Sequence, residues 1–367
     1  MKAQGWSVET IPRLALIALA AAAALVPLPA AEVEQLYSSH LYLDLQPWMT
    51  TLSNQVPVAC LDLLTVALSF VWLTFAFRDV ARRRSWPGAL GRVALRSATW
   101  TAALYLAFLA AWGLNYRRVP LIEKLAFDDA RVSAGAARDL GMIAVGEVNA
   151  LHAGAHAELG AGGTAAGTID PRLAAGFARA QQELGAGRLV QPARPKRTMF
   201  DPYLQRAGVS GMTDPFFLET LVAGDLLPIE RPFVVAHEWS HLAGIADEGE
   251  ANFVGWLTCL RGSPADRYSG WLFLTGELAR AVRQDDRQTI LSALAPGPRE
   301  DLRAIARRMQ QHVDPRISAA GWRAYNQYLR ANRVERGTAS YAEVVKLALG
   351  VSFDADWAPV LRERRGN

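Results

Sequence analysis

With 367 residues, the chain is long enough for two or three units of ordinary size. Hydrophobic residues make up 51% of it and charged residues 20%, which is apolar for a soluble protein and indicates a membrane part joined to a globular part. Although the net charge is +4, no basic patch with interleaved aromatic residues occurs, so we expect no nucleic-acid partner. The two cysteines, Cys60 and Cys259, lie in separate segments, and we expect no disulfide between them.

Three apolar runs near the N-terminus predict membrane-spanning helices, over residues 14–31, 57–77 and 97–116. Each run is close to the roughly 20 residues that a helix needs to cross a bilayer. The first run also fits the apolar core of a cleaved secretory signal, and this alternative stays open. Asp62 lies near one end of the second run, where a charge reaches the membrane interface at low cost.

Lysine and arginine predict how these helices are oriented. The segment 78–96 carries six arginines, whereas residues 14–77 contain neither lysine nor arginine. By the positive-inside rule, 78–96 is expected to be a cytoplasmic loop. We therefore expect a multi-pass protein of the cell (inner) membrane, surrounded by membrane lipid, with a transmembrane region over 1–118. A second domain over 119–367 is then expected on the periplasmic or extracellular side.

From residue 119 onward, apolar residues recur at helical spacing and predict a mainly α-helical domain. The expected helices cover residues 127–158, 171–184, 248–260, 271–282, 287–294, 300–312, 322–332 and 341–349. Residues 216–222 predict a short extended segment, which we interpret as an edge that could bind a peptide. His152 and His156 are four residues apart, but no third ligand lies near them in the sequence, so we interpret them as surface histidines.

The sequence from Val234 to Leu242 contains the pattern H-E-x-x-H at His237, Glu238 and His241. Residues four apart lie on the same face of a helix, so both imidazoles can bind one ion, which is most often Zn²⁺. Glu238 follows the first histidine and is placed to act as the general base for a metal-activated water. Because the flanking residues are apolar, the pattern predicts a buried zinc site rather than two core histidines.

A catalytic zinc site needs a third protein ligand, and three carboxylates follow at Asp247, Glu248 and Glu250. On the expected helix 248–260, Glu250 shares its face with apolar residues, whereas Glu248 shares a more mixed face. A carboxylate on a buried face is costly unless it is paired or binds a metal. This register favours Glu250 and leaves Asp247 and Glu248 as alternatives.

Several ordered stretches resemble a bacterial domain-of-unknown-function family of membrane-anchored proteins with zinc metallopeptidase features of the glutamate-zincin type. They are Trp112–Arg118, Val209–Gly211 with Pro215–Phe216, His237–Phe253, Tyr328–Asn332 and Ser340–Tyr341. The resemblance spans roughly residues 110–350. It implies zinc ligands at His237 and His241, a base at Glu238, and a third ligand in the block Glu250-Ala251-Asn252-Phe253, hence Glu250. Val254 stands where this group often has an aspartate, so the usual partner of the ligands must come from elsewhere.

We therefore expect a membrane region of three helices followed by a mostly helical, zincin-like domain that hydrolyses peptide bonds in a peptide or protein substrate with Zn²⁺. The oxyanion could be stabilised by one of four side chains, Tyr268, His312, Tyr325 or Tyr328. The alternative is a non-catalytic sensor or assembly factor with a structural zinc, for which Asp247 or Glu248 would supply a fourth ligand. The sequence predicts neither the oligomeric state nor the substrate.

Overall fold

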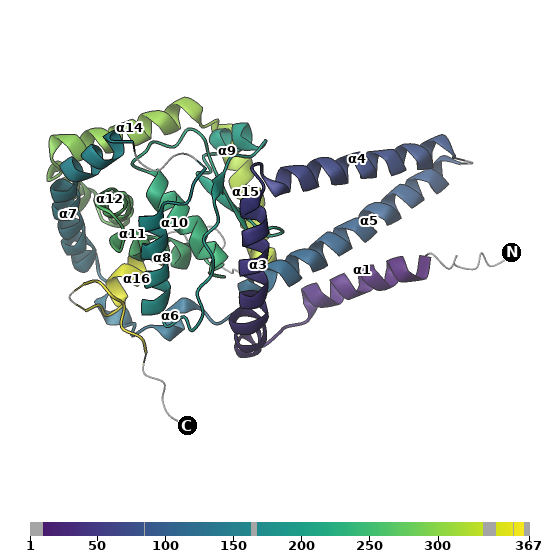
Figure 1. Ribbon diagram of the computed structural model, residues 1–367, viewed down its shortest axis with the longest axis horizontal. Coiled ribbons are helices and arrows are strands. Elements are labelled where there is room, and N and C mark those ends of the chain that lie inside the picture. Colours follow the sequence, from purple (N-terminus) through teal and green to yellow (C-terminus); the bar gives the residue numbers. More distant parts are fainter. Residues whose placement is uncertain (1–9, 84, 163–166, 333–342, 355, 363–367) are drawn as a thin grey trace, which may run out of the picture.

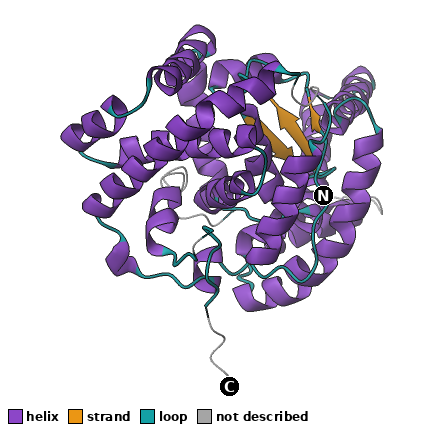
Figure 2. Ribbon diagram, turned by 60° about the vertical axis from the view of Figure 1, so that its left-hand side comes forward, coloured by secondary structure: helices purple, strands orange, loops and turns teal. Residues whose placement is uncertain are grey.

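The structure is a computed structural model that describes residues 10–83, 85–162, 167–332, 343–354 and 356–362. Most of these residues are helical, which agrees with the expected mainly α class. Figure 1 shows a rounded helical domain from which three helices, α1, α4 and α5, project to one side. The strands are few and short, and Figure 2 shows them together near one side of the helical domain.

Two of the projecting helices, α4 (Cys60–Ala81) and α5 (Trp86–Ala111), are long and apolar enough to cross a membrane. A third span is reached only if α1 (Thr10–Leu25) is joined to the helical segment Ala30–Gln55, and these two are bent by 110°. The expected helix 14–31 ends early because Pro27 and Pro29 follow Leu25, and proline cannot continue a helix. The structure is therefore compatible with a membrane protein of two or three spans.

The structure corrects the expected loop over residues 78–96. Helix α4 continues to Ala81 and α5 begins at Trp86, so only a short turn separates them. Ser85 caps α5 by accepting a hydrogen bond from the Gly88 amide, and Pro87 in the first turn favours a helix start there. Of the arginines of this segment that the structure describes, Arg78, Arg92 and Arg96 lie within the two helices, and the side of the membrane that the segment faces stays a prediction.

Residues 30–55 belong to the expected transmembrane region 1–118, and here they pack against the second domain. They form α2 (Ala30–Glu32), the π-helix η1 (Val33–Leu41) and α3 (Tyr42–Gln55). The buried Tyr42 hydroxyl donates to the Leu242 carbonyl at 2.7 Å, and Thr50 Oγ1 donates to the Leu218 carbonyl at 2.8 Å. Residues on the two sides of the expected domain boundary at residue 118 are therefore packed against each other.

The core of the domain is built by α7 (Ala134–Gly160), α8 (Pro171–Glu183), α10 (Arg231–Leu242), α11 (Glu248–Leu260) and α12 (Pro264–Ala281). Its largest fully buried side chains include Trp239, Trp256 and Trp271, one from each of α10, α11 and α12. Helix α11 is buried on all its faces from Glu248 to Cys259. Helices α10 and α11 pack directly on each other, so the side chains between them are held in fixed positions.

Other described elements surround these core helices. They are η2 (Gly113–Arg117), α6 (Leu121–Lys124), η3 (Asp129–Arg131), α9 (Asp201–Ala207), α13 (Gln284–Ser292), α14 (Pro296–His312), α15 (Pro315–Ala331) and α16 (Glu343–Gly350). Three strands, β1 (Pro195–Lys196), β2 (Gly211–Asp214) and β3 (Glu219–Val222), form a sheet in the order β1-β3-β2. Strand β3 pairs parallel with β1 and antiparallel with β2. The expected extended segment 216–222 thus contains the central strand β3, whereas β2 lies at the edge.

Candidate metal centre

Helix α10 places His237 and His241 on one face, one turn apart. The helix starts with Pro232 in its first turn and ends at Leu242, two residues before Gly244, which has a φ of 76°. There the amides of Gly244 and Ile245 bond back to the carbonyls of the last turn, an ending that favours glycine at the left-handed position. The two Nε2 atoms of His237 and His241 lie 3.2 Å apart and face each other.

Glu248 supplies the third group of this cluster. Its Oε2 lies 3.3 Å from His237 Nε2 and 3.5 Å from His241 Nε2. A tetrahedral zinc with bonds of about 2.0–2.1 Å separates its ligand atoms by about 3.3 Å. All three separations in the cluster are close to that value, so His237, His241 and Glu248 surround a point at bonding distance from each of them.

Hydrogen bonding leaves a carboxylate oxygen at this point unsatisfied. Glu248 Oε2 is buried, and among the described residues it has no hydrogen-bond partner. His241 Nδ1 lies 2.7 Å from the Ile245 carbonyl, which can only accept, so Nδ1 carries the proton and the neutral ring offers a lone pair at Nε2. Buried polar atoms without partners are costly, and a bound cation would satisfy them.

The charges of the cluster also favour a cation. Burial by itself would lower the pKa of His241, but the carboxylate of Glu248 raises it to about 9. Burial would likewise raise the pKa of Glu248, yet the imidazoles of His241 and His237 hold it well below the usual carboxyl range. Without a metal, the site therefore attracts a proton to the position that a metal would take.

The structure brings Glu248, and not Glu250, beside the two imidazoles. Two positions along a helix rotate a side chain by about 200°, so the two glutamates of α11 point to opposite sides. Glu250 Oε1 instead accepts hydrogen bonds from the amides of Leu121 at 2.6 Å and Ile122 at 3.3 Å. Burial, together with the nearby Asp247, raises the pKa of Glu250 to about 7.

This placement corrects the expected position of Glu250, and its physical reason is the packing of α11. The expectation took the apolar face of the helix as the face toward the metal, but α11 is buried on every side, so burial does not distinguish the faces. Asp247 is not at the cluster either. It caps α11 by accepting from the amides of Gly249 at 2.9 Å and Glu250 at 3.0 Å.

Glu238 is buried on the side of α10 that faces strand β2. Its Oε2 accepts a hydrogen bond from Thr213 Oγ1 at 2.9 Å. Gly211 passes so close that a Cβ there would lie 2.6 Å from Glu238 Oε1. Burial raises the pKa of Glu238, which makes this carboxylate a stronger proton acceptor than an exposed one.

Of the four side chains considered for stabilising an oxyanion, two are at the cluster. Tyr325 donates a hydrogen bond to Glu248 Oε1, and its ring stacks on Tyr328 with centroids 5.9 Å apart. Burial raises the pKa of Tyr328 to about 12, so its hydroxyl stays protonated. Tyr268 bonds to Asp301, and His312 lies 3.0 Å from Asp225, so these two belong to other parts of the domain.

Two residues that follow α5, Trp112 and Arg118, support helix α10, and the spacing of residues in the sequence pointed to neither. The indole of Trp112, directly after α5, donates to the His241 carbonyl at 2.8 Å, and its ring packs edge-on against His241. Arg118 donates to the carbonyls of Ala243 and Gly244 while it binds Glu34. Only the resemblance had drawn attention to Trp112–Arg118. Spacing offered no signal for it, since Trp112 is 129 residues from His241.

The chain belongs to the family described as "Protein of unknown function (DUF3810)", whose model matches residues 37–349. The match includes the end of α5, the cluster of His237, His241 and Glu248, and the aromatic residues of α15. No curated protein and no solved structure matches the chain. The family establishes an uncharacterised domain and assigns it no activity.

Proposed function

We propose that this member of the family is a membrane-anchored zinc metallopeptidase. In the proposed site, His237, His241 and Glu248 hold Zn²⁺, and Glu238 acts as the general base. One observation carries the proposal: the three ligand atoms are separated by 3.2, 3.3 and 3.5 Å, the spacing of a tetrahedral zinc site. The helical H-E-x-x-H arrangement then puts a carboxylate, Glu238, directly beside the first ligand.

Zinc bound there would supply Lewis acidity toward a peptide carbonyl and lower the pKa of a water molecule. Glu238 takes a proton from the attacking water and passes it to the leaving amine, a role that its raised pKa suits. Thr213, bonded to the same carboxylate, fixes its orientation. Tyr328, beside Tyr325 and still protonated at neutral pH, is the side chain that we assign to the developing oxyanion.

An extended substrate would reach this site along β2. This strand is at the edge of the sheet and lies against Glu238, so the edge of β2 that faces away from β3 is the one offered to a peptide. The proposed substrate edge is therefore β2 rather than the central β3. A cavity of about 400 Å³ near the start of α10, lined among others by Asp170, Arg172 and Arg231, does not include the cluster and plays no part here.

A structural zinc is the alternative reading, and it requires a fourth protein ligand. Within the described residues, the cluster has three candidate ligands, and Asp247, which would be the nearest fourth in sequence, is used as a helix cap. The imidazoles of His237 and His241 keep 13% and 10% of their side-chain surface exposed, which supports an open position for water. We therefore favour catalysis over a structural role.

The test is to replace Glu238 by Gln in full-length protein purified in detergent without a histidine tag. We expect Glu238→Gln to abolish cleavage of a fluorescence-quenched peptide library while zinc content, measured by mass spectrometry, stays as in the wild type. Glu300→Gln, at an exposed glutamate of α14, is the matched control and should cleave normally. Full activity of Glu238→Gln would refute the base assignment, and a wild type that binds no zinc at this site would refute the whole proposal.

A further inference from the structure

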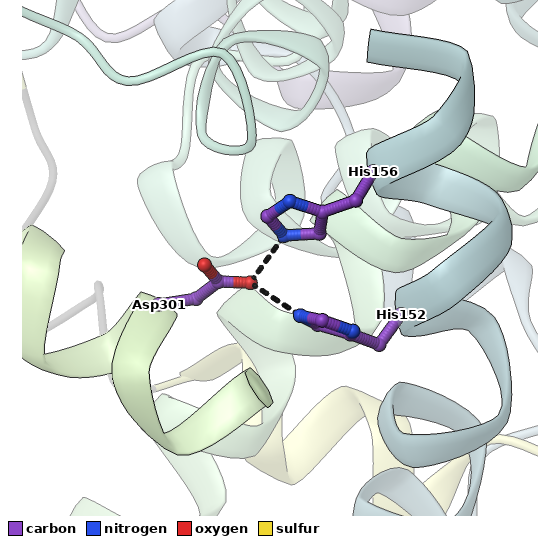
Figure 3. Close-up of side chains that lie close together, drawn as sticks. All are labelled: His152, His156 and Asp301. Carbon is purple, nitrogen blue, oxygen red and sulfur yellow. Dashed lines mark hydrogen bonds and ion pairs between the residues drawn. The ribbon is translucent and has the colours of Figure 1, made fainter. Parts of the chain in front are cut away.

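A second cluster of metal-binding side chains lies between α7 and α14. His152 and His156, one turn apart on α7, both turn toward Asp301 of α14, as Figure 3 shows. His156 Nε2 lies 2.8 Å and His152 Nε2 lies 3.6 Å from the same oxygen, Asp301 Oδ2. His156 is exposed, as expected of a surface histidine, but the expectation that no third group joins the pair is corrected: a carboxylate about 145 residues later in the chain lies beside both rings.

The geometry of this cluster suits one ion. The two nitrogen-to-oxygen separations, 2.8 and 3.6 Å, lie on either side of the approximately 3.3 Å expected between ligands of a tetrahedral ion. The two imidazole rings lie 4.3 Å apart and are tilted by 34°, so both Nε2 atoms can face one point. The ligand atoms of the three residues all lie within 4.8 Å of one another.

The surroundings hold the cluster in place. Tyr268 of α12 is fully buried and donates a hydrogen bond to Asp301 Oδ2, which fixes the carboxylate from behind. Gly297 lies against the ring of His152, where an added Cβ would come within 2.4 Å of the imidazole, so only glycine allows this approach. Asp301 is itself largely buried, with 12% of its side chain exposed. The side chains of His152 and Asp301 are therefore held in place by packing and hydrogen bonding.

Asp301 Oδ2 is crowded when no ion is present. It is hydrogen-bonded to His156 Nε2 and to the Tyr268 hydroxyl, and His152 Nε2 lies 3.6 Å away, beyond hydrogen-bonding distance. An ion bound by the two imidazole lone pairs removes this crowding and leaves Tyr268 as the remaining donor. The side chain of His156 is 43% exposed, so an ion and a completing water can reach the site from solvent.

We propose that His152, His156 and Asp301 form a second binding site for a divalent transition-metal ion of the zinc class, separate from the cluster on α10. Two imidazoles and one carboxylate suit such ions, whereas Mg²⁺ and Ca²⁺ prefer oxygen ligands. Tyr268 is a positioning residue for Asp301. A bound ion would join α7 to α14. Figure 1 shows α7 on the side of the domain opposite to the projecting helices α1, α4 and α5. The site does not depend on the proposed peptidase activity.

The experiment counts zinc in tag-free, full-length protein that carries His241→Asn, so that the cluster on α10 is disabled. We expect this protein to bind one equivalent of zinc and to melt at a higher temperature when zinc is present. Adding His156→Asn should remove both the zinc and the shift in melting temperature. His312→Asn is the matched control, because His312 also lies beside an aspartate but has no second imidazole, and it should change neither.

Two further variants keep the test informative if His156→Asn folds poorly. Asp301→Asn retains an acceptor for Tyr268 and removes only the charge, so it should lose zinc without unfolding. Tyr268→Phe should weaken zinc binding roughly tenfold and leave one equivalent bound at saturation. The proposal is overturned if the His241→Asn protein binds no zinc, or if zinc persists in the Asp301→Asn variant. If zinc is lost on His156→Asn but unaffected by His241→Asn, this site stands and the proposed peptidase centre fails.

Discussion

Replacing Glu248 by Gln in one variant and Glu250 by Gln in another tests which of these two carboxylates binds the proposed metal ion. Glu248 lies at 3.3 and 3.5 Å from the two imidazoles, whereas Glu250 is bonded to the amides of Leu121 and Ile122. Glutamine keeps the size of each side chain and an oxygen that can accept hydrogen bonds, but it removes the charge. Only the first substitution should therefore change metal binding.

The size of the effect follows from the attraction of the site for a proton. The pKa of His241 rises from 6.5 to about 9, chiefly through the charge of Glu248 acting against the cost of burial. One pKa unit corresponds to about 1.4 kcal/mol, so the site favours the protonated imidazole over the neutral one by about 3 kcal/mol more than water does. Zinc carries two charges and takes the same position, so Glu248→Gln should weaken its binding by at least that amount, or roughly 100-fold.

A competition titration against a chromogenic chelator measures this difference, with His156→Asn as the background so that only one site is counted. Glu248→Gln should lose about 100-fold in zinc affinity, and Glu250→Gln should bind zinc as tightly as its parent. Circular dichroism at 25 °C checks that both variants are folded. Equal weakening in the two variants, or a larger effect of Glu250→Gln, would refute the assignment of Glu248 as the third ligand.

Three other predictions use the same contacts. Without zinc, protonated His241 stabilises the fold below pH 6.5, and this stabilisation should be lost as the pH rises through about 9. Urea unfolding at pH 6 and pH 9.5 measures the loss. An equal free energy of unfolding at both pH values would contradict the coupling to Glu248. Gly211→Ala should displace the Glu238 carboxylate and lower peptide cleavage at least tenfold with zinc retained; unchanged turnover would show that β2 does not position Glu238. Trp112→Phe removes the donor to the His241 carbonyl and should lower the free energy of unfolding by about 1 kcal/mol, against no change for the exposed Trp48→Phe.

Much of the local structure follows from the sequence alone, because helices and their caps depend on neighbouring residues. Helix α11 was expected over 248–260 and is found there, with Asp247 as its cap. The juxtaposition of His237 and His241 also follows from the sequence, since residues four apart on a helix share a face whatever surrounds them. The same reasoning predicted the helical class of the domain and the apolar character of the N-terminal helices.

Tertiary structure decided which distant groups complete these local pairs. Glu248 was chosen over Glu250 by the rotation of α11 against α10, and a helix that is buried on every face carries no sequence signal for that rotation. Asp301 reaches His152 and His156 only because α14 packs beside α7, about 145 residues later in the chain. Spacing along one helix follows from backbone geometry, whereas contacts between helices depend on how whole surfaces pack together.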